Sequence, residues 1–207
     1  FFQKRLAVER QASPHTCDTY AYAFQLLFEF MSRKCAVAPA DLALEHLDAS
    51  LVLEFLDHLQ QSRHNSGRTR NARLAAIRSF MRFVEYRVPA ALDQVRRVRA
   101  ICVQRTTTRL VRHLSVAEQR ALLDAPEPTT RLGIRDRAML LLALAGGLRV
   151  SELVGLRVDA AVFSGRYVDV RVSGKGRRER ALTLWKSVGD ALRAWLAVRG
   201  DAPAPEL

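Results

Sequence analysis

The sequence has 207 residues, 49% of them hydrophobic and 26% charged, so it can bury a core and is long enough for two small domains. Its formal net charge is +12, from 33 Lys and Arg against 21 Asp and Glu, and arginines spread along predicted helices supply most of the excess. This charge predicts a polyanionic partner and favours nucleic acid over a membrane, because the most apolar stretch, residues 138–147, is too short to span a bilayer.

The number and spacing of the cysteines indicate the redox environment and whether a zinc site is expected. Cys17, Cys35 and Cys102 are an odd number and form no CxxC pair, which predicts neither a zinc site nor a disulfide framework. We therefore expect a reducing, cytoplasmic environment and no bound metal. The first residues do not show the charged and then apolar pattern of a secretory leader. Because Phe1 is not an initiator and the final residues form a loop with no element after it, we expect truncation at both ends.

The first half of the chain is predicted to be a helical domain over residues 1–104. A helix starts at Ser13-Pro14 and continues to about residue 34, and two further segments show apolar residues at helical spacing. A short fourth helix follows Pro89. The apolar residues of the first three faces are Tyr20, Phe24, Leu27, Phe28, Met31, Val52, Phe55, Leu56, Leu59, Leu74, Ile77, Met81 and Val84. We expect these helices to share one core.

A basic linker and a second domain are predicted to follow. Residues 105–113 are rich in Thr and Arg and have no apolar period, which indicates an extended linker. The second domain, residues 114–207, opens with a capping box formed by Ser115 and Glu118, and a further helix is predicted over residues 130–145. The residues expected to be buried in that helix are Leu140, Leu141 and Leu144.

After this helix the periodicity changes to two residues. Val168, Val170 and Val172 alternate with polar residues, a glycine-rich turn follows, and an apolar segment returns at 181–184. This pattern predicts a β-hairpin with a basic tip. A final helix lies around Leu192. The chain is therefore predicted to be mainly α with a small β-hairpin or sheet.

An arginine-rich helix is the first candidate for contact with DNA. Over residues 67–82 the arginines lie on or beside the face opposite Leu74 and Ile77, and no acidic residue appears before Glu85. A solvated surface helix is the ordinary interpretation, but the missing acidic partners and the extra hydrogen-bond donors favour DNA. The residues expected to bind DNA on this helix, the linker and the hairpin are Arg68, Thr69, Arg70, Asn71, Arg73, Arg78, Arg109, Arg112, Arg177 and Arg178.

Arg149 lies in the second candidate site, the segment AGGLRVSELVGLR at residues 145–157. Gly146-Gly147 end a helix, so the backbone turns sharply and holds Arg149 between two helix ends, where its planar fork can grip two oxygens of one phosphate. Glu152, three residues on, can brace that guanidinium. Alternatively, Arg149 caps carbonyls and Glu152 complements the helix dipole. The motif alone leaves both interpretations open.

Lys175 is the third candidate, because it lies between two glycines at the tip of the predicted hairpin. Flanking glycines let the tip approach a ligand closely, and a lysine there can reach into a groove. An ordinary exposed turn has the same composition. A phosphate-binding P-loop is excluded, because no glycine stands five residues before Gly174 and Gly176 occupies the Ser/Thr position.

Taken together, these motifs resemble those of the tyrosine recombinase, or phage integrase, family of DNA strand-exchange enzymes. The resemblance covers nearly the whole chain: LSxxE at 114–118, Arg135-Asp136, GLRxSEL at 147–153 and GKG at 174–176, in that order. It implies an N-terminal SAM-like helical core-binding domain followed by the first half of an α+β catalytic domain.

The resemblance also implies roles for the candidate residues. Arg149 corresponds to the first catalytic arginine, which stabilises the charge of the pentacoordinate phosphate. Glu152 matches the acidic residue that supports it, and Lys175 matches the hairpin lysine that protonates the 5′-hydroxyl leaving group. The bond energy is kept in a 3′-phosphotyrosyl link, so neither a metal nor another cofactor is implied.

One departure from the family is large. The His-x-x-Arg pair, a further His or Trp and the tyrosine nucleophile would all follow Leu207, and none of the four tyrosines is assigned as the nucleophile. We therefore expect the full-length parent to be an enzyme and this fragment to bind DNA without cleaving it.

The partners implied are double-stranded DNA and further copies of the chain, with a tetramer expected for the full-length parent. Two other functions stay open at this point. One is a non-enzymatic DNA-binding regulator, which has no use for the GKG hairpin; the other is a naturally truncated recombinase that occupies sites without cleaving them.

Overall fold

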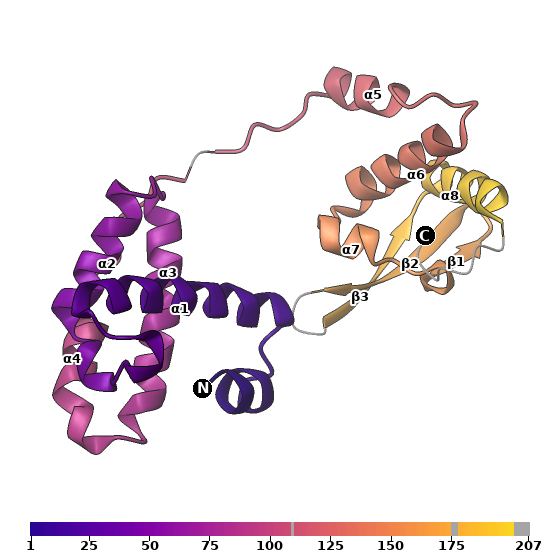
Figure 1. Ribbon diagram of the computed structural model, residues 1–207. Coiled ribbons are helices and arrows are strands. Elements are labelled where there is room, and N and C mark those ends of the chain that lie inside the picture. The colour runs from indigo at the N-terminus through magenta and orange to yellow at the C-terminus, as the bar shows by residue number, and fades with distance from the viewer. Residues whose placement is uncertain (109, 175–177, 201–207) are drawn as a thin grey trace. The chain divides into compact units, whose positions relative to one another are not determined.

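The computed structural model describes residues 1–108, 110–174 and 178–200, except for the side chain of Arg178. Contacts between residues divide the chain into two compact units, 1–109 and 110–207, which are described separately (Figure 1).

The first unit consists of helices whose starting points are set by capping side chains. The hydroxyl of Ser13 accepts a hydrogen bond from the Thr16 amide, and Asp48 and Ser66 cap the next two long helices in the same way. The helices are α1 (Pro14–Cys35), α2 (Ala49–Gln61), α3 (Gly67–Glu85) and α4 (Leu92–Ala100), with short helical turns at Phe2–Glu9, Pro39–Asp41, Leu44–His46 and Pro89–Ala91.

All three long helices contribute their predicted apolar faces to one core. Phe24 and Leu27 of α1, Phe55 of α2 and Ile77 of α3 are buried together, and α1 runs across α2 and α3 (Figure 1). The prediction missed the N-terminal turn, Phe2–Glu9, which adds aromatic rings beside Phe24. The shared helical core is confirmed, but Phe28, predicted to lie on the apolar face of the first helix, is 42% exposed.

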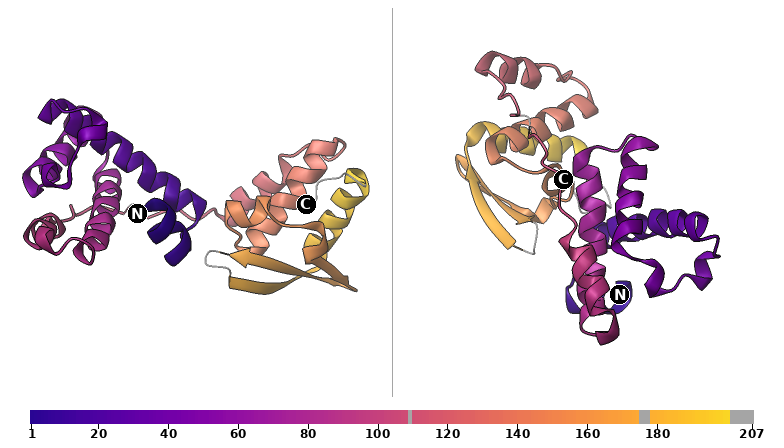
Figure 2. Two further views of the ribbon diagram at one scale, coloured as in Figure 1. Left: turned by 60° about the horizontal axis from the view of Figure 1, so that its bottom comes forward. Right: turned by 90° about the vertical axis from the view of Figure 1, so that its left-hand side faces the viewer.

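The second unit packs helices on a three-stranded sheet. Its helices are α5 (Val116–Asp124), α6 (Arg131–Gly146), α7 (Val150–Val154) and α8 (Lys186–Arg199), with a short turn at Val158–Ala160. The strands β1 (Ala161–Ser164), β2 (Tyr167–Gly174) and β3 (Arg178–Leu184) form an antiparallel sheet in the order β1-β2-β3. The left-hand view of Figure 2 shows α6 and α8 on one side of this sheet.

Apolar and polar side chains alternate along β2, and this alternation decides which face of the sheet the helices cover. Val168, Val170 and Val172 are buried against α6 and α8, whereas Arg171 between them is exposed. The predicted hairpin strands are confirmed, but β1 was not predicted. The expectation of a mainly α chain with a small sheet is confirmed, and among residues 1–108, 110–174 and 178–200 no helix is long and apolar enough to cross a membrane.

The predicted burial within α6 was wrong in detail. Ala138 and Leu142 are the buried apolar residues of this helix, while Leu140 and Leu141 are half-buried and Leu144 is exposed. The cause is the direction of the helix, which turns its Ala138 side toward the sheet and α8. Three adjacent leucines could not identify that side, because a run of apolar residues has no period.

Gly133 sets how closely the first turn of α6 packs on the preceding loop. A Cβ atom at this position would lie 1.8 Å from the carbonyl oxygen of Glu127. That oxygen also accepts hydrogen bonds from Thr130, whose hydroxyl caps the Gly133 amide at 3.0 Å. The turn therefore has no room for a side chain.

We predict that Gly133→Ala destabilises the second unit by about 1–3 kcal/mol, because the backbone of residues 127–130 must move. Gly189→Ala in α8 is the matched control: its Cβ would meet no atom closer than 3.6 Å, and Ala stabilises a helix by about 1 kcal/mol relative to Gly. Urea unfolding followed by tryptophan fluorescence measures both, since Trp185 and Trp195 both lie in this unit. Equal stability of the two variants would contradict the prediction.

Candidate functional site

The glycine pair after α6 places Arg149 at a helix start. Gly147 adopts a left-handed conformation, with φ 56° and ψ 38°, which an L side chain rarely takes. The chain then turns, and Arg149, with φ −71° and ψ 152°, becomes the N-cap residue of α7. The sharp turn expected from the sequence is present.

Glu152 connects to Arg149 through both its backbone and its side chain. Its Oε2 accepts from the Arg149 backbone N–H at 3.0 Å, and its Oε1 accepts from Arg149 Nη1 at 3.0 Å. The Glu152 side chain is only 3% exposed, whereas that of Arg149 is 69% exposed. The expected bracing contact between Glu152 and the Arg149 guanidinium is therefore present, and Glu152 also caps the first turn of α7 through the Arg149 backbone N–H.

A second arginine, Arg180 of β3, completes this cluster. Its Nη1 donates to Glu152 Oε1 at 3.1 Å and its Nη2 donates to Oε2 at 2.9 Å, which is a two-pronged pairing. Arg180 pairs across the sheet with Val172, so its side chain leaves the sheet on the covered face. Arg180 is not among the residues predicted for the site. The signal was an arginine at a strand position where the alternation with Leu182 and Leu184 predicts an apolar residue.

The two guanidiniums keep Glu152 ionised. The hydrogen bonds from Arg180 and from the Arg149 backbone, which outweigh the effect of burial, lower the pKa of Glu152 from 4.5 to about 2. The same pairing raises the pKa of Arg180. The cluster of two cations and one anion thus carries a net positive charge and presents it through the exposed Arg149.

Lys175, Gly176 and Arg177 lie outside the described residues, so their placement in the site stays a prediction. The strands on either side of them are described: β2 and β3 pair antiparallel up to Gly174 and Arg178.

Two arginines of α3, Arg70 and Arg78, are bonded to backbone carbonyls of the first unit. Arg70 is 5% exposed, and its Nη1 donates to the carbonyl oxygen of Cys102 at 3.3 Å. Arg78 is half-buried and donates to the carbonyl oxygen of Ile101. These two side chains are long enough to reach carbonyls that follow α4, so each is bonded within the first unit. Their contact with DNA stays a prediction.

Asn71 and Arg73 are also engaged within the first unit. Asn71 exchanges two hydrogen bonds with the backbone of Gln104, at 2.8 and 3.0 Å. Arg73 donates to the carbonyl of Thr19 at 3.3 Å and lies over the ring of Tyr22. Residues 101–104 are thus attached to α3 along a seam of side-chain-to-backbone hydrogen bonds, which we call the 101–104 seam.

Arg68 is exposed, as expected of a DNA-binding residue, and lies beside a polar hollow of about 550 Å³. The hollow is lined by Ser66, Gly67, Arg68, Gln104, Arg105, Thr106 and Thr107. Thr69 is half-buried, with its amide bonded to the Ser66 hydroxyl. Arg112 is exposed and Arg178 lies in β3, while Arg109 lies outside the described residues.

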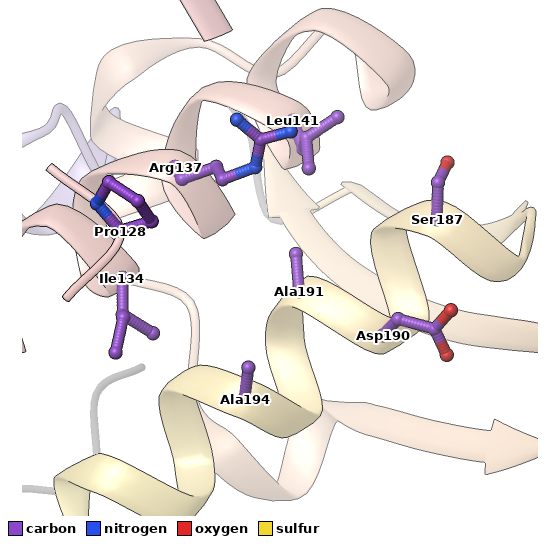
Figure 3. Close-up of a pocket in the computed structure, with 8 residues that line it drawn as sticks. All are labelled: Pro128, Ile134, Arg137, Leu141, Ser187, Asp190, Ala191 and Ala194. Atoms are coloured by element: carbon purple, nitrogen blue, oxygen red, sulfur yellow. The ribbon is translucent and has the colours of Figure 1, made fainter. Parts of the chain in front are cut away.

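A separate pocket of about 340 Å³ lies between α6 and α8 (Figure 3). Ile134 and Leu141 face Ala191 and Ala194 across it. Its charged residues have partners, since Arg137 pairs with Asp124 and Asp190 pairs with Lys186. No polar groups converge there, so it is not the candidate site. In the described part of the chain no cluster of His, Cys, Asp or Glu could hold a metal ion.

Two family models match the two units. The Phage integrase family model matches residues 112–206, and the model of the Phage integrase N-terminal SAM-like domain matches residues 1–87. The fold and the arginine site thus define a class of two-domain integrase-like proteins. The chain belongs to the phage integrase, or tyrosine recombinase, family, as the sequence resemblance indicated.

Relatives support this membership along the whole chain. Two proteins of Sinorhizobium fredii, y4rC and y4rD, both provisionally named integrase/recombinase, are 44% and 40% identical over 97% and 98% of this chain. The tyrosine recombinase XerC of Pelotomaculum thermopropionicum is 36% identical over 93% of the chain. This chain spans 61%, 72% and 61% of those three relatives.

Solved structures agree with the fold. The XerH site-specific recombinase bound to a palindromic difH substrate superposes with a TM-score of 0.68 at 20% identity, over 92% of this chain and 55% of that one. A lambda integrase dimer bound to a COC′ core site, residues 75–356, gives 0.65 at 16% identity, over 91% and 64%. The SAM-like first domain and the partial integrase catalytic domain are therefore confirmed as the fold.

The lowered pKa of Glu152 predicts an acid-dependent stability. The folded carboxylate contributes fully above its ordinary pKa of 4.5, and this contribution is lost as the pH falls toward about 2. Over that window the free energy of unfolding should fall more steeply for the wild type than for Glu152→Gln. Urea unfolding at several pH values, followed by tryptophan fluorescence, measures the difference. The same pH dependence in both proteins would show that the pairing is absent in solution.

Proposed function

We propose that this chain binds duplex DNA and contributes part of an active site that cleaves and rejoins the DNA backbone through a 3′-phosphotyrosine intermediate. Residues 1–104 act as the core-binding domain, residues 105–113 as the basic linker and residues 114–207 as the N-terminal part of the catalytic domain. The single observation that carries the proposal is the exposed guanidinium of Arg149 held on a buried carboxylate.

This arrangement suits an arginine that receives a phosphate. A guanidinium has five donors, and Arg149 uses Nη1 on Glu152 while most of its side chain stays exposed. Because Glu152 is bonded to both the backbone and the side chain of Arg149, the direction of the fork is restrained before any ligand arrives. A fixed donor group stabilises transition-state charge without reorganising during the reaction.

In the proposed reaction a tyrosine hydroxyl, present in a protein as long as the relatives, loses its proton to solvent. Its oxygen forms a bond to phosphorus while the bond from phosphorus to the 5′-oxygen breaks. Arg149 binds the non-bridging oxygens on which negative charge develops. Lys175 transfers its proton to the departing 5′-oxygen, so the leaving group departs as a hydroxyl. Glu152 acts through Arg149, whose guanidinium it holds. Neither a metal nor another cofactor takes part.

Binding of DNA by this chain is supported by its charge and by its relatives' structures. The net charge is +12, and the XerH and lambda integrase structures contain DNA. Exposed Arg68 and Arg112 are suited to bind phosphates, with Arg109, Arg177 and Arg178 as further candidates. On DNA the protein is proposed to act as a homo-oligomer, with a tetramer for the full-length form.

We predict that affinity for duplex DNA falls with salt, with a slope of log K against log salt near −5 if about 6 phosphates are neutralised. Arg68→Ala should reduce the magnitude of this slope by about 1. Arg97→Ala is the control, since Arg97 is exposed on α4 and paired with Asp93. Fluorescence anisotropy at several salt concentrations gives the slopes. A salt-independent affinity would contradict phosphate binding.

We predict that strand cleavage requires the side chains of Arg149 and Lys175, whereas affinity for DNA depends little on either. Cleavage is measured in a protein of the relatives' full length, made by joining this chain to the C-terminal segment of y4rC, with a nicked duplex that traps the covalent product. Arg149→Ala or Lys175→Ala should reduce cleavage by about 100-fold or more, with DNA affinity nearly unchanged.

Arg171→Ala, on the exposed face of β2, is the matched control and should cleave normally. If both Arg149→Ala and Lys175→Ala retain cleavage, the assignment of the site is wrong. If the extended protein binds DNA but forms no covalent product, a binding protein without strand cleavage is the better description.

A further inference from the structure

We propose that Arg180 is a positioning residue for strand cleavage: it occupies the carboxylate of Glu152 so that the guanidinium of Arg149 remains directed outward, toward the phosphate. This inference rests on the proposed function and assigns a role to a residue outside the motifs that suggested it.

The distribution of hydrogen bonds around Glu152 carries the argument. Each carboxylate oxygen accepts one bond from Arg180 and one from Arg149. Arg180 supplies two guanidinium nitrogens, whereas Arg149 supplies one guanidinium nitrogen and its backbone N–H. The two-pronged grip therefore belongs to Arg180, and Arg149 is held by one prong only.

The exposed fractions of the two arginine side chains also differ, with Arg149 the more exposed. The side chain of Arg180 is 37% exposed and that of Arg149 is 69% exposed, around a carboxylate that is 3% exposed. A buried carboxylate needs full compensation of its charge. Without Arg180, the guanidinium that still bonds to this carboxylate among the described side chains is that of Arg149. A planar fork turns readily into a two-pronged pairing with a carboxylate. Arg149 would then point inward, and its guanidinium would pair with Glu152 instead of binding a phosphate.

The position of Arg180 in the sheet adds a second effect. Arg180 belongs to β3, and its pairing with Glu152 ties that strand to the start of α7. The same ion pair therefore joins β3 to the helix whose N-cap residue is Arg149.

A double-mutant cycle in the extended protein tests this role, with single-turnover cleavage of the nicked duplex and DNA affinity as readouts. Arg180→Ala should slow cleavage by about 10-fold or more while DNA affinity changes by less than about 2-fold. Arg180→Lys should reduce the cleavage rate less than Arg180→Ala, because a lysine still neutralises Glu152. Some loss should remain, because a lysine cannot form the two-pronged pairing.

The decisive measurement is Arg180→Ala in the Glu152→Gln background. In that background no carboxylate can capture Arg149, so Arg180→Ala should reduce the cleavage rate by less than about 2-fold. A purely structural role in β3 predicts the same loss in both backgrounds. Arg171→Ala is the control on β2 and should leave cleavage and coupling unchanged.

The outcomes separate this inference from the proposed function. If Arg149→Ala abolishes cleavage while Arg180→Ala does not, or if the cycle shows no coupling, the role of Arg180 is refuted and the proposed function stands. If wild-type cleavage is absent or does not depend on Arg149, the proposed function itself fails. Should Arg180→Ala unfold the second unit, Arg180→Lys in the two backgrounds decides the question by the same comparison.

Discussion

One buried carboxylate organises the site. Removing a carboxylate from water is unfavourable unless hydrogen-bond donors and opposite charge replace the lost hydration. Glu152 obtains both from Arg149 and Arg180, which lie on different elements, the start of α7 and strand β3. The requirement for compensation therefore holds a helix end and a strand together, and the surplus positive charge is left on the more exposed arginine.

The features that depend on neighbouring residues could be predicted from the sequence, and those that depend on distant residues could not. Capping residues and apolar spacing located the helices, and the three-residue separation of Arg149 and Glu152 was enough to suggest their contact. Strand β1 and the pairing of Arg180 with Glu152, 28 residues away, arise from how the sheet packs on α7. Lys175 lies outside the described residues, so its part in the site is an inference from the motif.

The arginines of α3 show a limit of helical patterns. A helical wheel places Arg70 and Arg78 by their Cα positions, but a long side chain can bend back to a carbonyl on a neighbouring segment. Such bonds do not neutralise the guanidinium, so both residues still add to the positive field of the first unit. Among the residues of this helix that were predicted to bind DNA, Arg68 is the exposed one.

The 101–104 seam has a consequence for the start of the predicted linker. Because Cys102 and Gln104 are bonded to α3, the chain that follows α4 is held against the first unit. Arg105, Thr106 and Thr107 then line the same hollow as Arg68. The direction in which this basic segment leaves the first unit is therefore set by Asn71, which grips both backbone groups of Gln104, and not by the sequence of the segment alone.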